Sequence, residues 1–288
     1  MWILFANVLI NGTINGSIYA LIALGFSLTF GVAGVVNLYH GAYYMVAAYL
    51  TYTFISLNFP SWLAAIISLL LVAGLGGLMM KGPILYLRKK GESIYILIFT
   101  LGAAYFTQYL FTMLYGARRY SIMPFYDNAL NIMGETVPGS RVFAFIISII
   151  TIIAVMLFIN KTSFGKQILA TSQDVYAAEL VGINTSSVFI LTSAISALLA
   201  GIGGIVISPF LSISVDMWLP TLLKAFSIVI LGGLGSIGGS IVAAFIMAYI
   251  EGIVAITWTS SMTEVVFLVL VFIFLIFKPT GIMGKKTI

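Results

Sequence analysis

The sequence predicts an all-α protein, a polytopic bundle of transmembrane helices with broken helices and about eight or nine spans. Of its 288 residues, 61% are hydrophobic and only 7% are charged, whereas soluble domains carry about 25% charged residues. No Lys, Arg, Asp or Glu precedes Lys81, and so long an uncharged stretch does not form a soluble surface. We therefore expect residues 1–288 to form one multi-pass domain in the lipid bilayer of the cell membrane.

Uncharged apolar runs locate the spans, and basic residues orient them. The expected spans are 5–31, 40–57, 62–80, 94–115, 142–159, 187–208, 220–257 (interrupted) and 262–277. Most Lys and Arg residues fall in 81–90, 161–166 and 278–286, and a basic bias in short loops favours the cytoplasmic side. We therefore expect the N-terminus and the loop Gly116–Ser140 on the outer side. Residues such as Pro124 predict irregular chain in that loop.

A polar, Ala-rich connector at 161–186 separates the fifth apolar run from the sixth, and it is too long for a simple turn. Thr171 and Asp174 have the spacing of a capping box, which predicts a helix that begins there. Gly182 stands where such a helix would end. The connector is therefore expected to project from the membrane as a short helix.

The expected helix is amphipathic. Tyr176, Leu180 and Ile183 recur at helical spacing on one face, with polar residues off that face. We expect this surface to dock on a partner protein, although a solvated connector lying on the lipid headgroups remains an alternative. The residues expected to couple to the partner are Gln173, Asp174, Tyr176, Ala178, Glu179, Leu180 and Gly182.

The connector resembles the coupling loop of ABC-importer permeases that import branched-chain amino acids. The residues that carry the resemblance are Gly165, Lys166, Ala170, Gln173, Asp174, Ala177, Ala178, Leu180, Gly182, Ile183 and Asn184. The chain departs from the pattern at Leu169, where the family usually has an arginine that contacts its partner. Three further blocks, Asn15–Gly41, Lys224–Gly239 and Lys278–Ile282, are similar to the same family in the same order.

This resemblance implies a set of partners. A permease of this kind pairs with a second permease subunit, two ATPase subunits and an external substrate-binding protein that delivers leucine, isoleucine, valine or related amino acids. The chain has no Gly-x4-Gly-Lys-Ser/Thr loop to cradle nucleotide phosphates, so we expect it to be a transport subunit rather than an enzyme. Its basic residues lie in short loops, which favours no nucleic-acid partner.

Four residues near the first two spans are candidates for a translocation path or gate: Asn15, Asn37, His40 and Gly41. His40 is the chain's one histidine, and there is no cysteine. A metal site or a catalytic triad is therefore not expected, and neither is a cofactor. The resemblance places Asn37, His40 and Gly41 in a family motif without giving them a role. Buried amides such as Asn15 also pin helices together.

Five glycines crowd the centre of 220–257, at 232, 233, 235, 238 and 239. Gly233, Gly235 and Gly238 match a dinucleotide fingerprint in form, but the soluble βαβ context that it requires is missing. Close helix packing and a broken helix that exposes backbone to a translocation path are both open. The segment is accordingly either two spans joined by a tight turn or a re-entrant helix.

Charged residues within the apolar runs support a second hypothesis. Lys224, Glu251 and Glu264 lie within or at the ends of these runs, where a charge has to pair, extend to the interface or line water. Extension to the outer interface is the first expectation for Lys224. The alternative function is an ATP-independent secondary transporter or channel for a small polar solute. The scarcity of intramembrane carboxylates argues against ion coupling of that kind.

Overall fold

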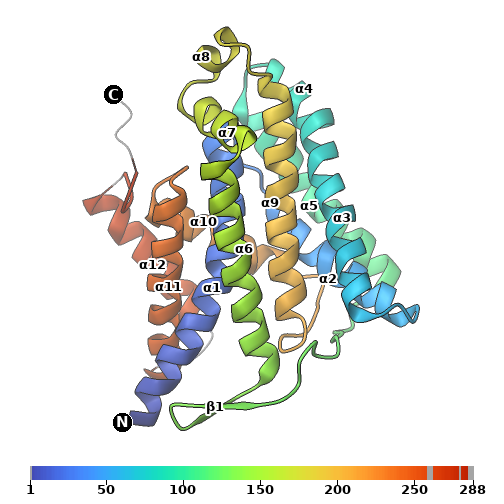
Figure 1. The fold of residues 1–288 in the computed structure, drawn as a ribbon, viewed down its shortest axis with the longest axis vertical. Helices are drawn as coiled ribbons and strands as arrows, with labels where there is room; N and C mark the ends of the chain where they lie inside the picture. The colour runs from blue at the N-terminus through green and yellow to red at the C-terminus, as the bar shows by residue number, and fades with distance from the viewer. Residues whose placement is uncertain (1, 258–261, 279, 285–288) are drawn as a thin grey trace.

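The structure is a computed structural model that describes residues 2–257, 262–278 and 280–284 (Figure 1). The side chain of Glu264 and residues Lys285 and Lys286 lie outside this description. Within the described residues, nine helices make the bundle: α1 Trp2–Ala33, α2 His40–Ser56, α3 Ser61–Met79, α5 Ser93–Tyr115, α6 Gly139–Lys161, α9 Thr185–Ile207, α10 Trp218–Gly232, α11 Ile237–Thr257 and α12 Met262–Phe277. In the same part of the chain, six helical segments are long and apolar enough to cross a membrane, which confirms the predicted helical membrane bundle.

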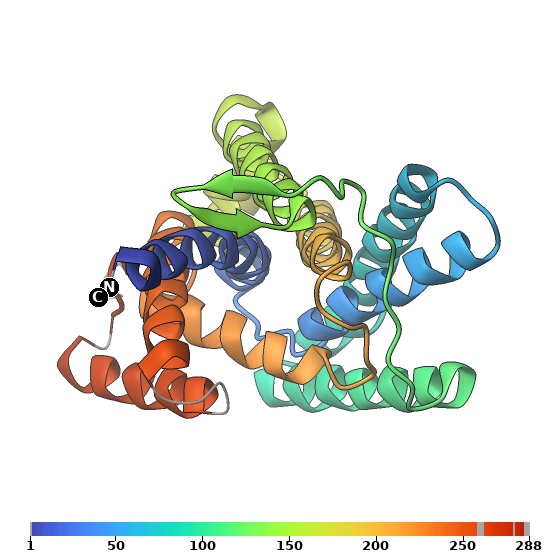
Figure 2. The same ribbon diagram turned by 90° about the horizontal axis from the view of Figure 1, so that it is seen from below.

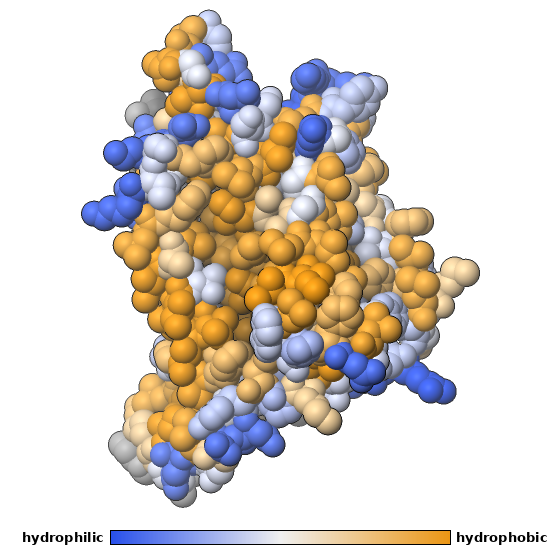
Figure 3. Space-filling view, turned by 45° about the vertical axis from the view of Figure 1, so that its right-hand side comes forward, coloured by the Kyte–Doolittle hydropathy of each residue, from blue (hydrophilic) through white to orange (hydrophobic). Residues whose placement is uncertain are grey.

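The bundle has a buried centre and an apolar exterior that suits contact with lipid. Among the six segments long enough to span, α1 and α9 are the most enclosed. In an apolar stretch of 18 residues, 83% of α1 and 67% of α9 is buried, against 22% of α6. α1 packs along both α11 and α9. Seen from one end, α6, the group of α2, α3 and α5, and the group from α10 to α12 surround them (Figure 2). On the face that Figure 3 shows, apolar side chains cover most of the middle, and strongly polar ones gather at the two ends.

One end of the bundle brings together the ends of several helices. Val32 of α1, Ile168 of α7 (Ser163–Gln173) and Phe189 of α9 belong to one buried cluster. The short helices α4 (Leu85–Lys89) and α8 (Val175–Leu180) lie at this end, and the N-terminus and strand β1 lie at the other (Figure 1). The basic groups at 81–90 and 161–166 therefore share one end, as the charge distribution predicts.

The sequence did not predict how the third span ends. α3 continues through a π-helical turn, η1 (Met80–Ile84), into α4. Pro83 lies inside this turn, and because proline has no backbone N–H, the regular hydrogen-bond ladder is interrupted there. The apolar helix accordingly runs from Ser61 to Lys89. Three of the basic residues expected in a loop therefore lie on helix.

The loop Gly116–Ser140, which we expect on the outer side, is more ordered than its turn residues suggest. Strands β1 (Leu130–Ile132) and β2 (Glu135–Val137) form an antiparallel hairpin. The two residues between them, Met133 and Gly134, have φ of 54° and 87°, as a two-residue hairpin turn of the primed type requires. Before the hairpin, Tyr120 pairs through its backbone with Ile213, which joins this loop to the α9–α10 connection.

Single cysteines in this cysteine-free chain test which end faces the cytoplasm. Tyr176 is 71% exposed at the α8 end, and Met123 is 81% exposed in the outer loop. In intact cells we expect an impermeant thiol reagent to label Met123→Cys and to leave Tyr176→Cys unlabelled. Permeabilised cells should show labelling of both variants. Labelling of Tyr176→Cys in intact cells would invert the assigned orientation.

Candidate functional site

The connector forms two helices, α7 and α8, in place of the one predicted. Thr162 caps α7 by accepting a hydrogen bond from the backbone N–H of Gly165 at 2.9 Å. Thr171 lies inside α7 and is buried, so the predicted capping box is wrong. Asp174 has extended backbone angles that end α7, and its carboxylate caps α8 by accepting from the N–H of Ala177 at 3.0 Å.

Gly182 ends α8 as the sequence predicts. Its φ is +86°, the left-handed region in which glycine carries no steric penalty. The N–H of Ile183 donates to the carbonyl of Ala178, and the N–H of Gly182 donates to that of Glu179, both at 3.0 Å. This pair of bonds is a Schellman motif. It turns the chain sharply into α9, whose first turn is capped by Asn184.

The outward surface of α8 is apolar. Tyr176 and Leu180 are each 71% exposed, and Val181, which the sequence analysis did not select, is 77% exposed. Ile183, expected on the same face, instead packs against the buried cluster at this end of the bundle. Ala178 is also buried. The three exposed side chains, Tyr176, Leu180 and Val181, are called the α8 patch below.

Polar groups surround the α8 patch. Gln173, Asp174 and Glu179 are all exposed. Glu179, however, already accepts a hydrogen bond from the hydroxyl of Thr185 at 2.6 Å, which ties the end of α8 to the start of α9. Its carboxylate therefore has a role within the chain as well as facing solvent.

His40 joins three helices at the centre of the bundle. It is 1% exposed. Its Nε2 lies 3.0 Å from the carbonyl oxygen of Ile22 in α1, and its Nδ1 lies 3.2 Å from the hydroxyl of Ser196 in α9. Because a carbonyl only accepts, Nε2 of the neutral ring donates and Nδ1 accepts from Ser196. These bonds make His40 a structural link, and a gating role stays a prediction.

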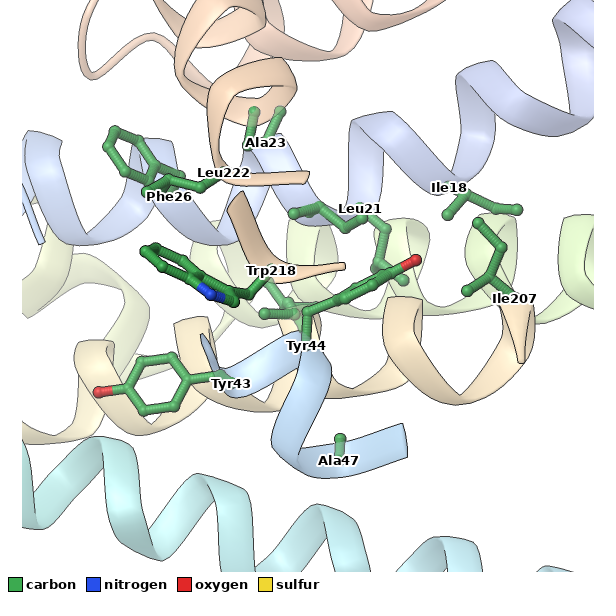
Figure 4. Packing of buried hydrophobic residues seen from close by; sticks show 14 of the residues in the cluster. Ile18, Leu21, Ala23, Phe26, Tyr43, Tyr44, Ala47, Ile207, Trp218 and Leu222 are labelled. Atoms are coloured by element: carbon green, nitrogen blue, oxygen red, sulfur yellow. The ribbon is translucent and has the colours of Figure 1, made fainter. Parts of the chain in front are cut away.

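Asn37 and Gly41 shape the entry to α2 on either side of His40. The side-chain oxygen of Asn37 accepts from the backbone N–H of Tyr39 at 3.0 Å. A side chain on Gly41 would overlap the carbonyl oxygen of Trp218, so the glycine permits close approach of α2 and α10. Trp218 is fully buried there, in the packing that also contains Tyr43, which Figure 4 shows.

Asn15 does not share these contacts. It is partly buried on α1, one turn from Asn11, whose side-chain oxygen accepts from Arg141 of α6. The pinning role considered for amides in this helix therefore belongs to Asn11. The structure brings Asn37, His40 and Gly41 together and leaves Asn15 apart from them.

The glycine-rich segment is a tight turn between α10 and α11. Gly233 and Gly235 have φ of +101° and +80°. Gly235 packs on Gly31 of α1, where an added Cβ would lie 3.0 Å from the Gly31 Cα. The segment after α12 also packs here, since the N–H of Ile282 donates to the carbonyl of Leu231 at 2.8 Å. Close packing, one of the two alternatives, is what these glycines make possible.

The three glycine positions that match the dinucleotide fingerprint should differ in how well they tolerate a larger side chain. We expect Gly233→Leu and Gly235→Leu to lower the thermal stability of the purified protein, because both combine positive φ with a backbone neighbour. Gly238→Leu should behave almost as wild type, since the Met283 sulfur at 3.7 Å is its one near neighbour among the described residues. The measurement is the melting temperature in detergent, with alanine variants as size controls. Equal tolerance of leucine at all three positions would contradict this assignment.

An ion pair lies in the interior between α10 and α11. Lys224 Nζ is 2.7 Å from Glu251 Oε1 and donates to the hydroxyl of Tyr19 at 2.9 Å. Tyr19 in turn donates to Glu251 Oε2 at 2.7 Å, which closes a triangle. Lys224 thus pairs rather than extending to the interface as first expected. The sequence did not indicate Tyr19, which lies 205 residues from Lys224.

Comparison with known proteins identifies the family. The sequence profile described as branched-chain amino acid transport system, permease component, matches residues 8–275. The chain belongs to this permease family. It is 27% identical to a high-affinity branched-chain amino acid transport system permease protein, LivH, of Salmonella typhimurium, covering 99% of this chain and 97% of the relative. The permease BraD of Pseudomonas aeruginosa is 26% identical, over 97% and 96% of the two chains.

The permease also resembles a solved structure. PsaBC from Streptococcus pneumoniae, solved in complex with Fab, matches with a TM-score of 0.51 at 15% identity, covering 93% of this chain and 91% of that one. At this identity the likeness shows the fold alone. Together, the family and the apolar helices make this a multi-pass cell-membrane protein of a transport family, whose members are transport subunits and not enzymes.

Proposed function

We propose that this permease is the membrane-spanning subunit of an ATP-driven ABC importer for branched-chain or related amino acids. A second permease subunit would complete the pathway, two ATPase subunits would supply the energy, and an external binding protein would deliver the substrate. The names of the relatives, high-affinity branched-chain amino acid transport system permease proteins, support this substrate class.

The α8 patch carries the proposal. Apolar side chains that are 71–77% exposed, on a helix capped at both ends and on the residue that directly follows it, suit an amphipathic segment that fills a groove on a partner. The sequence has no phosphate-cradling loop of its own. An ATPase on another polypeptide is therefore the partner that the patch suits best.

The connector also supports a route by which the partner would act on the spans. α7 buries Ile168 in the cluster that includes Val32 of α1, Met80 of η1 and Phe189 of α9. A displacement of α8 would reach these helix ends through packed side chains. ATP that binds one arrangement of the complex more tightly than the other would shift access from outside to inside.

A second function is favoured by one observation. The Lys224–Glu251 pair is an ionisable cluster inside a membrane bundle, and such clusters also serve ion-coupled carriers. An ATP-independent secondary transporter or channel for a small polar solute is therefore the alternative.

Reconstitution separates the two functions. The permease is placed in proteoliposomes with its ATPase subunits and binding protein, and uptake of labelled leucine is followed. We expect uptake only when ATP and the binding protein are both present, with a parallel rise in ATP hydrolysis. Uptake by the permease pair alone, driven by an ion gradient, would favour the alternative and overturn the importer assignment.

A further inference from the structure

A cavity of about 290 Å³ opens beside the ion pair. Its wall combines α1, the start of α2, the α9–α10 connection and α10, and includes Tyr19, Tyr44, Ser214 and Lys224. In Figure 4, Tyr44 extends from α2 toward Ile207, another lining residue. A volume at the low end of the range for ligand pockets fits a single small molecule.

Lys224 presents an unused donor at this wall. Its ammonium group has three N–H donors. One is used by Glu251 and one by Tyr19, and the third has no hydrogen-bond partner in the part of the chain that the structure describes. Lys224 lines the cavity, and its partner Glu251 is not among the described lining residues.

The rest of the wall offers a second cation and apolar surface. Arg119, from the outer loop, also lines the cavity, and it forms no ion pair with any described carboxylate. Ile22, Ile207 and Leu211 contribute hydrocarbon. No Asp or Glu is among the lining residues that the structure describes, so this part of the cavity carries a surplus of positive charge next to an apolar surface.

A buried charge pair is costly to maintain for stability alone. Moving both groups out of water costs several kcal/mol per ion, and an apolar pair of similar volume is often as stable. A charge inside a membrane protein is therefore a functional candidate by default. The cavity beside the pair is the place for such a function, because Lys224 lines its wall while Glu251 and Tyr19 hold the ammonium group.

We propose that the cavity is a transit site for a small apolar α-amino acid, with Lys224 binding its carboxylate and the apolar wall contacting its side chain. This inference rests on the proposed function and adds the chemistry by which the permease itself holds its substrate. Arg119 at the outer side attracts the carboxylate, and the Thr221 hydroxyl, which also lines the cavity, accepts from the ammonium group.

Protection of a cysteine in the cavity tests the site. Ser214→Cys is introduced into the permease complex, and its labelling by a thiol reagent is measured with leucine, 4-methylpentanoate or leucinamide, with and without an ATP analogue. At a ligand concentration about ten times the dissociation constant, labelling should slow about tenfold. We expect this with leucine and 4-methylpentanoate, which keep the carboxylate, and not with leucinamide, which lacks it. Met123→Cys, outside the cavity, should react equally throughout.

A charge-exchanged background separates binding from structure. Lys224→Glu with Glu251→Lys retains an ion pair but places a carboxylate at the wall, so protection of Ser214→Cys by leucine should disappear. Retained protection in that background would make the pair structural and overturn the proposal. Absence of leucine protection in both nucleotide states, or equal protection by leucinamide, would also overturn it. If leucine protects Ser214→Cys and also enters vesicles whose permease has no ATPase subunits, the binding site is supported and the importer assignment is wrong.

Discussion

A complex carrying Leu180→Asp is expected to lose ATP-driven leucine uptake while the permease still folds in the membrane. Leu180 is 71% exposed, so its replacement disturbs little within the chain. In a groove on the ATPase, loss of its buried surface costs about 2 kcal/mol, which weakens binding about thirtyfold. The added carboxylate increases that loss, because a charge is desolvated without a partner. Pull-down of the ATPase and uptake in vesicles measure the effect.

A matched substitution at the opposite end of the bundle tests whether the added charge alone causes the loss of uptake. Leu57, in the α2–α3 turn, is 60% exposed, so Leu57→Asp makes the same change away from the α8 patch. We expect this variant to bind the ATPase and to take up leucine as wild type does. Normal uptake by Leu180→Asp would contradict the coupling role of α8.

The sequence located the spans well because hydropathy depends on each segment alone. The sequence misplaced the start of α8, because the same residues are compatible with a cap at Thr171 and with a cap at Asp174. Thr171 and Asp174 have the spacing of a capping box, but Thr171 faces the bundle and is 1% exposed. Only the packing of α7 against the other helix ends decides that Asp174, and not Thr171, is the cap. Gly182 was predicted correctly because its role depends on its own backbone angle.

The partners of buried polar groups could not be predicted, because they come from distant parts of the chain. His40 meets Ser196, 156 residues away, and Lys224 meets Tyr19 and Glu251. The sequence indicated that a membrane charge would need a partner, but no local pattern selects one carboxylate from several. Arg119 was expected in the outer loop from the count of spans, and only the fold brings it to the same cavity as Lys224.

Single neutralisation of the ion pair is expected to destabilise the permease more than removal of both charges. In Lys224→Met, Glu251 keeps only the Tyr19 hydrogen bond. Breaking a buried pair by removing one partner costs about 3 kcal/mol or more. The low end applies here, because the two side chains remain 20% and 16% exposed. The melting temperatures of Lys224→Met and Glu251→Leu should both fall well below that of wild type.

The double variant Lys224→Met with Glu251→Leu should regain most of that stability, since two apolar side chains leave no uncompensated charge. Transport should not return with it, because the cavity then lacks its inner cation. Melting temperature and leucine uptake are measured on the same preparations, with Ser172→Ala on the exposed surface of α7 as a neutral control. A double variant that transports normally would assign the pair to folding alone. A double variant less stable than either single one would show that the charges stabilise the bundle beyond their mutual attraction.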